Sequence, residues 1–204
     1  MKSIMISIQP QWVEKILNGE KTIEIRKTMP KCELPVKVYI YCTQGQMLHD
    51  MKDEEYWTGK RFAYGSNKSN DIIWSATPFV NGKVVAEFTL NKVDRCGEAV
   101  YDANRDLWED WNTLGLNNSC VHPYDLEEYS NGYELYAWHI DNLKIYDKPK
   151  ELSEFKKENK CYYSDYDKGC CCECCTFYDL GDCDGRCSKL ERPPQSWCYC
   201  EGEM

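Results

Sequence analysis

The sequence of 204 residues lacks any long apolar run. No stretch reaches the roughly 18 consecutive apolar residues that a membrane-spanning helix needs. The first ten residues alternate between apolar and polar side chains, unlike the continuous apolar segment of a secretory leader. We therefore expect a cytoplasmic protein that is neither exported nor inserted into a membrane.

Positive charge is also scarce, because 25 Lys and Arg stand against 34 Asp and Glu, giving a net charge of −9. Proteins that coat a nucleic-acid backbone obtain their nonspecific affinity from many Lys and Arg side chains. This composition excludes such a protein, so any contact with nucleic acid must be local. Residues 1–44 are the exception, since they hold seven Lys and Arg against four Glu.

The chain has no internal repeat, and its length suits one domain with an appendage. Alternating and helical spacings of apolar residues predict a β-rich α+β fold in a domain of residues 1–150. We expect strands over residues 4–8, 22–26, 36–42, 84–90, 133–139 and 143–146. We expect short helices over residues 10–17, 106–114 and 123–129.

The stretch from about residue 44 to residue 82 has no sustained apolar period. Unpatterned segments of this length are either decorated insertions or lids over a site. Its glycines and its Ser/Asn run at 66–70 favour mobility, so we predict a lid that closes over the site described next.

The most informative stretch is Gly19–Arg26, in which a turn and a lysine precede alternating polar residues. Alternation places Thr22, Glu24 and Arg26 on one face of a strand. Such a face is either solvated, with Glu24 and Arg26 weakly paired, or it lines a site.

Several segments together resemble a known family: Ser7–Pro10, Trp12–Val13, Ile16–Leu17, Gly19–Arg26, Val38–Cys42 and Gly82–Phe88. They are similar to the ASCH domain of the PUA-like superfamily over about residues 1–147. The motif at 19–26 is the specific part. The residues Tyr129, Tyr133, Tyr136–Ile140 and Arg192–Tyr199 resemble a variant found in phages and prophages of Gram-positive bacteria.

The resemblance implies a small closed β-barrel with flanking helices and a cleft lined by the motif. Members of the superfamily mostly bind RNA or modified bases, and some relatives hydrolyse acetylated cytidine or cleave RNA. Lys21 matches the lysine of those hydrolases, whereas Glu24 stands where they have threonine. Their carboxylate has no assigned counterpart in this sequence.

The motif offers groups that suit base recognition. Lys21 and Arg26 can hold a phosphate or a carbonyl, and Glu24 can accept from an amino group on a base. We expect Lys21 at the mouth of the cleft, so that Lys21→Ala changes stability by less than about 1 kcal/mol.

Ten of the 14 cysteines lie in the last 44 residues, in a tail that we assign to residues 151–204. Closely paired cysteines in a protein without a secretory leader indicate a structural zinc site. The candidate ligands are Cys161, Cys172, Cys175, Cys183, Cys187 and Cys198. A redox-sensitive or disulfide-linked tail is the alternative.

Three functions are consistent with these patterns. The first is a module that recognises RNA, a nucleotide or a modified nucleobase through Lys21, Thr22, Glu24 and Arg26, with Zn2+ as a structural cofactor. The second is an amidohydrolase or ribonuclease with Lys21 and Glu24 as catalytic groups. The third is an adaptor whose tail binds a host protein.

Overall fold

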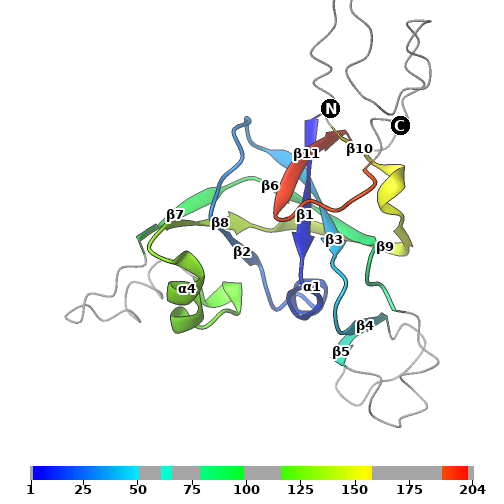
Figure 1. The fold of residues 1–204 in the computed structure, drawn as a ribbon, viewed down its shortest axis with the longest axis horizontal. Helices are drawn as coiled ribbons and strands as arrows, with labels where there is room; N and C mark the ends of the chain where they lie inside the picture. The colour runs from blue at the N-terminus through cyan, green and yellow to red at the C-terminus, as the bar shows by residue number, and fades with distance from the viewer. Residues whose placement is uncertain (1, 51–60, 66–78, 99–115, 158–189, 202–204) are drawn as a thin grey trace, which may run out of the picture.

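The computed structural model describes residues 2–50, 61–65, 79–98, 116–157 and 190–201. Figure 1 shows a mostly β architecture with short helices on its periphery. The elements are β1 Lys2–Ile8, α1 Pro10–Leu17, β2 Ile23–Arg26, β3 Val36–Cys42, β4 Met47–Asp50, β5 Phe62–Gly65, β6 Val84–Leu90, β7 Val93–Glu98, η1 Leu116–Ser119, α4 Pro123–Ser130, β8 Glu134–His139, β9 Asp141–Lys150, η2 Leu152–Glu154, β10 Lys156–Lys157 and β11 Trp197–Glu201. The predicted strands and two of the predicted helices are present. The third, at 106–114, lies outside the described residues.

The main sheet has six strands in the order β10-β11-β1-β3-β6-β9. Strand β1 runs parallel to β3, with Ile6 opposite Ile40, because the chain crosses over through α1 between them. On its other side β1 pairs antiparallel with β11, with Met5 opposite Cys198. The C-terminal strand therefore lies beside the N-terminal one (Figure 1).

A second sheet has the order β2-β8-β7. The ribbon formed by β6 and β9 continues into β7 and β8, and the change of sheet occurs near residues 91–92 and 140. At this corner the amide of His139 donates to the carbonyl of Lys92, and the amide of Ile140 donates to that of Thr22. Strand β2 thereby joins the second sheet, with Glu24 opposite Trp138.

The described strands do not form the closed barrel that the family resemblance implied. They are divided among sheets of six, three and two strands, and the edge strands of the largest sheet, β10 and β9, are not paired with each other. The ribbon of β6 and β9 leaves the main sheet near residues 91–92 and 140, so the main sheet does not close on itself. The described fold is a mixed α+β arrangement of packed sheets.

Strand β1 is buried on both faces, although its alternation predicted a half-buried strand. Ile4, Ile6 and Ile8 belong to the larger apolar cluster, which also contains residues of α1 and Trp138. Met5 faces the opposite side, in a cluster with Leu152, Phe155 and Leu190. Residues that follow position 150 therefore cover the second face of the main sheet.

The packing of these C-terminal residues affects the predicted division of the chain into a domain of residues 1–150 and a tail of residues 151–204. Strands β10 and β11 belong to the main sheet, and Phe155 and Cys200 are fully buried. Both described ends of the predicted tail are thus part of the domain's sheet and core. Residues 158–189, which hold most of the cysteines, lie outside the described part of the chain.

The described parts of the predicted lid are packed rather than free. Strands β4 and β5 pair with each other, and Leu48 and Phe62 enter the apolar cluster under α1. Asn81 fixes this region by accepting from the amide of Leu48 at 2.8 Å. Residues 51–60 and 66–78 lie outside the described residues. Among the described residues, no helix is long and apolar enough to cross a membrane.

Candidate nucleobase-binding cleft

A tight turn after α1 directs Lys21 into the interior. The carbonyl of Lys15 accepts from the amides of Glu20 and Lys21 at 2.8 and 3.1 Å. Gly19 makes this reversal possible because its φ of 77° lies in the left-handed region. The chain then enters β2 at Ile23, so that Lys21 lies just before the strand that carries Glu24 and Arg26.

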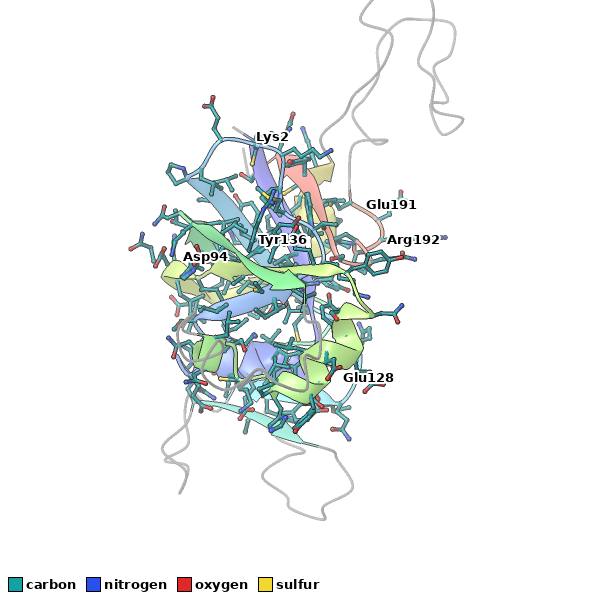
Figure 2. The ribbon with its side chains drawn as sticks, turned by 90° about the vertical axis from the view of Figure 1, so that its left-hand side faces the viewer. Lys2, Asp94, Glu128, Tyr136, Glu191 and Arg192 are labelled. Atoms are coloured by element: carbon teal, nitrogen blue, oxygen red, sulfur yellow. The ribbon has the colours of Figure 1, made fainter. Side chains whose placement is uncertain are left out.

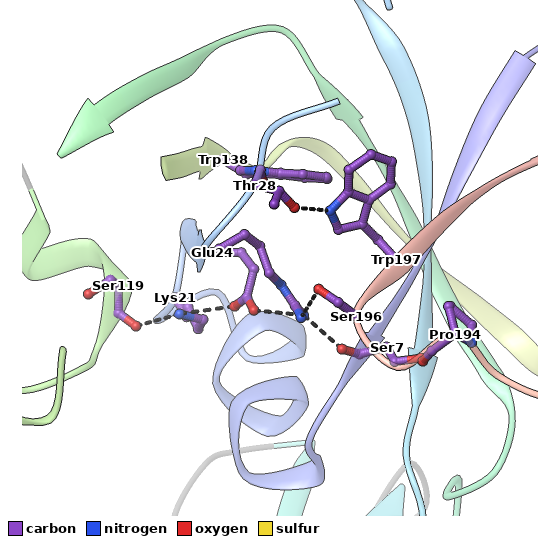
Figure 3. Close-up of polar contacts among 10 residues, drawn as sticks. Ser7, Lys21, Glu24, Thr28, Ser119, Trp138, Pro194, Ser196 and Trp197 are labelled. Carbon is purple, nitrogen blue, oxygen red and sulfur yellow. Dashed lines mark hydrogen bonds and ion pairs between the residues drawn. The ribbon is translucent and has the colours of Figure 1, made fainter. Parts of the chain in front are cut away.

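Lys21, Glu24 and Arg26 form one buried group of charges, which we name the cleft-floor cluster (Figure 3). Lys21 Nζ lies 3.2 Å from Glu24 Oε2, and Arg26 Nη2 lies 3.0 Å from Glu24 Oε1. The three side chains are 1%, 9% and 10% exposed. Both carboxylate oxygens of Glu24 are therefore held by cations.

The two cations are also held by the main chain. Lys21 Nζ donates to the carbonyl of Ser119 at 2.6 Å, and Arg26 Nη2 donates to the carbonyl of Ser7 at 2.7 Å. Arg26 Nη1 donates to Ser196 Oγ at 3.3 Å. The cluster is thus fixed by partners that lie 98, 19 and 170 positions away in the sequence.

One expectation about the motif is wrong. Lys21 is not at the mouth of the cleft, because its residue is only 2% exposed. For the polar strand face the sequence left two alternatives, solvation or a site, and the structure buries Glu24 and Arg26 together with the rest of β2. Residues of η1 and α4 pack on the face of Ile23 and Ile25, and Ser7 and Ser196 contact Arg26 on the other face. Alternation alone could not reveal these covering segments. Thr22 is exposed and does not line the cleft, so the structure separates it from the other three motif residues.

The unused hydrogen-bonding capacity of the cluster consists of donors. An ammonium has three N–H groups and a guanidinium five, and neither accepts. Arg26 Nε is buried and has no hydrogen-bond partner among the described residues. Glu24, the acceptor of the cluster, already contacts both cations. A ligand that meets this floor is best served by an oxygen or nitrogen acceptor.

The cluster forms the floor of a cleft of about 690 Å³. Ser7, Gln9 and Trp12 line it from β1 and α1, Val121, Asp125, Leu126 and Tyr129 from α4 and the segment before it, and Thr43 from the end of β3. This volume lies within the range of small-molecule sites. Figure 2 shows helix α4, labelled at Glu128, on the face turned by 90° from Figure 1.

Two aromatic rings flank the polar floor. Trp12 lines the cleft, with Lys21 Nζ 5.4 Å from its ring centroid. Tyr129 also lines the cleft and is 39% exposed, with Lys27 Nζ 4.8 Å from its ring centroid. Burial raises the pKa of Tyr129, and the nearby charge of Arg26 opposes that shift. The phenol therefore stays neutral at physiological pH and presents a flat ring.

The last wall of the cleft comes from Pro193, Pro194, Gln195 and Ser196, which we name the C-terminal strap. These residues belong to the Arg192–Tyr199 segment that resembles the phage-type variant, and nothing in the sequence connected them to the motif. Their proximity follows from the pairing of β11 with β1, which brings the preceding residues beside Ser7. The Arg-Pro-Pro-Gln-Ser-Trp sequence was a local signal, but only the strand pairing connects it to the motif.

Cys198 is the one predicted metal ligand in the described part of the chain. It lies on β11 and packs against the apolar cluster that contains Met5 and Phe155. No group of three or more His, Cys, Asp or Glu suited to a metal occurs among the described residues. The predicted ligands Cys161, Cys172, Cys175, Cys183 and Cys187 lie outside them.

Comparison with known proteins gives matches of structure only. No family model and no curated protein matches the sequence. The structure is similar to the crystal structure of ASCH from Zymomonas mobilis, at 16% sequence identity and a TM-score of 0.45 over 74% of this chain and 73% of that one. A mutant form of that protein gives 16% identity and a TM-score of 0.46, over 74% of this chain and 77% of the other.

The matches are to ASCH structures. The motif at residues 19–26 resembles the same family. An ASCH likeness at 16% identity does not transfer site residues or activity to this chain, so its function has to be inferred from its own cleft.

Proposed function

We propose that the cleft binds a single nucleobase, presented by a nucleoside, a nucleotide or a single-stranded RNA. The observation that supports this most directly is the cleft-floor cluster, in which Arg26 Nε is buried without a hydrogen-bond partner among the described residues, in a cleft that Trp12 and Tyr129 also line. Flat rings stack with any base, and protein donors hydrogen-bond to the base edge. A cleft of about 690 Å³ has room for one nucleoside rather than a duplex.

The chemistry of the floor favours bases that carry a carbonyl. Lys21 and Arg26 have donors to spare, and neither Lys nor Arg can accept a hydrogen bond. Cytosine, uracil and guanine each offer a carbonyl oxygen, which can accept two hydrogen bonds, whereas the acceptors of adenine are ring nitrogens that accept one each. We therefore propose a preference for these three bases over adenine. Because the carboxylate of Glu24 is held by two cations, the floor supports recognition better than base catalysis.

Titration of the full chain with the four ribonucleosides, with N4-acetylcytidine and with short single-stranded RNAs tests this proposal. Trp12 lines the cleft, so its fluorescence reports binding, and calorimetry gives the affinity. Arg26→Lys keeps the charge but removes the Nε donor and the planar fork. Loss of one charge-assisted hydrogen bond corresponds to roughly 10-fold to 150-fold weaker binding.

Thr22→Ala is the matched control, because Thr22 belongs to the same motif but is exposed outside the cleft. It should bind like the wild type. Absence of binding to every nucleoside and RNA at millimolar concentration would refute the proposal, as would equal affinities for the Arg26→Lys and Thr22→Ala proteins. Binding of phosphate-bearing ligands alone would show that the cations hold a phosphate rather than a base.

Mass spectrometry of the same samples tests the enzymatic alternative. Deacetylated cytidine or cleaved RNA, lost in Lys21→Ala and Glu24→Gln, would make the protein a hydrolase or nuclease. Unchanged ligands together with measurable affinity would support the recognition module.

We also propose that the tail of residues 151–204 binds structural zinc through the predicted ligands, on the strength of their cysteine spacing. Metal analysis of the full chain, purified under reducing conditions, should find about one zinc per chain. Protein with clearly less zinc would favour the redox-sensitive tail instead. Pull-downs with the tail's cysteines replaced test whether a host protein binds there.

A further inference from the structure

The C-terminal strap is held on both sides of Gln195. Ser7 Oγ donates to the carbonyl of Pro194 at 2.7 Å, and the amide of Ser7 donates to the carbonyl of Ser196 at 2.9 Å. Figure 3 shows these neighbours facing Ser7 on β1. Two consecutive prolines precede Gln195 and restrict the backbone further.

The residue after the strap is fixed as well. Trp197 Nε1 donates to Thr28 Oγ1 at 2.9 Å, and the Trp197 ring lies 5.6 Å from that of Trp138 (Figure 3). The Nε1 group of Trp138 donates to the carbonyl of Thr28 at 3.2 Å. The strap is therefore bound to the loop that follows the motif strand, and its position relative to Arg26 is set by several contacts.

The side chain of Gln195 is not part of this support. Gln195 lines the cleft and is exposed, and its amide makes no hydrogen bond to the described residues. By contrast, Ser7 and Ser196 both use their side-chain oxygens within the protein. Gln195 thus offers a free amide on a rigid backbone at the wall of a cleft.

The side-chain amide of Gln195 supplies the free hydrogen-bond acceptor that the cleft-floor cluster lacks. It carries a donor and an acceptor side by side, whereas the unused groups of Lys21 and Arg26 are all donors. A glutamine amide pairs with two adjacent groups on the edge of a base, and such a bidentate contact discriminates among bases. A base whose carbonyl meets Arg26 can present a second edge group to the strap.

We propose that Gln195 is a specificity-determining residue, which reads the donor and acceptor pattern of the base that the cleft-floor cluster holds. This inference rests on the proposed function of the cleft. In this role Gln195, which lies about 170 positions after the motif, selects among cytosine, uracil and guanine.

The experiment compares wild type, Gln195→Ala and Gln195→Glu in titrations with cytidine, uridine, guanosine and adenosine. Gln195→Ala should weaken binding of the preferred nucleoside by roughly 5-fold to 100-fold and reduce the differences among nucleosides. Gln195→Glu keeps the shape but replaces the donor by a second acceptor. It should therefore change the order of preference, an effect that a purely structural role would not produce.

Gln46→Ala is the matched control, because Gln46 is exposed and does not line the cleft. Because the Gln195 side chain has no hydrogen-bond partner among the described residues, its variants should melt within a few degrees of the wild type. Wild-type binding with unchanged affinities and order of preference in both Gln195 variants would overturn this inference and leave the proposed function intact. Absence of wild-type binding would instead refute the proposed function.

Discussion

The cleft-floor cluster can be compared with a second cluster on the main sheet, which likewise has two cations and one glutamate. There Glu87 lies between Lys37 and Lys144, with Nζ to Oε1 distances of 3.2 and 3.9 Å. Its lysine side chains are 49% and 70% exposed, whereas Lys21 is 1% exposed. We name this second group the sheet-face cluster.

Both clusters place two cations on one carboxylate, so the difference between them is solvation. Lys37 and Lys144 exchange their contacts with water at little cost, as exposed pairs generally do. Lys21 and Arg26 have been taken out of water, and Arg26 Nε has no hydrogen-bond partner among the described residues, so a ligand acceptor that reached it would remove the cost of an unpaired buried donor. Burial, and not the kinds of residues present, marks the cleft-floor cluster as the candidate site.

The same substitution at the two carboxylates should give the largest contrast. Glu24→Gln leaves two buried cations without an anion, and breaking a buried pair in this way costs about 3–5 kcal/mol. Glu87→Gln should cost less than about 1 kcal/mol because its lysines are exposed. Urea unfolding of both variants measures the two free energies of unfolding. Equal losses would mean that burial does not separate the clusters.

Lysine substitutions give a second, smaller contrast. Lys21→Ala removes one of two cations from Glu24 and leaves the carbonyl of Ser119 without its donor. The expected loss is about 2–4 kcal/mol, below that for Glu24→Gln because Arg26 remains. This replaces the loss of less than about 1 kcal/mol expected when Lys21 was placed in solvent. Lys37→Ala should still lose less than about 1 kcal/mol, and a loss that small for Lys21→Ala would contradict its buried position.

The element pattern of the fold was largely predictable, because apolar alternation in residues such as Ile4, Ile6 and Ile8 reports local structure directly. The burial of Lys21 was not, since it depends on Ser119, 98 positions away. The same holds for the strap, which reaches the cleft only because β11 pairs with β1. Periodicity tells which residues share a face, and distant segments decide what covers that face.

The C-terminal strap contacts Arg26 and so contributes to the burial that distinguishes the cleft-floor cluster from the sheet-face cluster. Ser7→Ala tests how strongly the strap is held. The substitution removes the 2.7 Å bond to the carbonyl of Pro194 but keeps the backbone bond to Ser196. A lost hydrogen bond of this kind costs about 1 kcal/mol. Thermal unfolding should show that loss, and hydrogen exchange should show weaker protection at Ser196 and Trp197. Unchanged protection there would mean that β11 alone positions the strap.

The smallest expected effect concerns the acid sensitivity of the sheet-face cluster. Burial acts to raise the pKa of Glu87, but hydrogen bonds from Tyr146 and Lys37, together with the charges of Lys37 and Lys144, outweigh it and lower the pKa below the ordinary value of 4.5. A carboxylate whose pKa is lower in the folded state stabilises the protein above its unfolded pKa, and this contribution is lost as the pH falls through the folded value. The free energy of unfolding of wild type should therefore exceed that of Glu87→Gln at pH 7, and the difference should shrink as the pH falls below about 4.5. Urea unfolding at pH 7, 5, 4 and 3 measures the difference, with Thr22→Ala as a variant that leaves both clusters intact. A difference in the free energy of unfolding that stays constant across this pH range would show that the contacts of Glu87 stabilise its neutral and charged forms equally. It would then contradict ion pairing as the interaction that holds the sheet-face cluster.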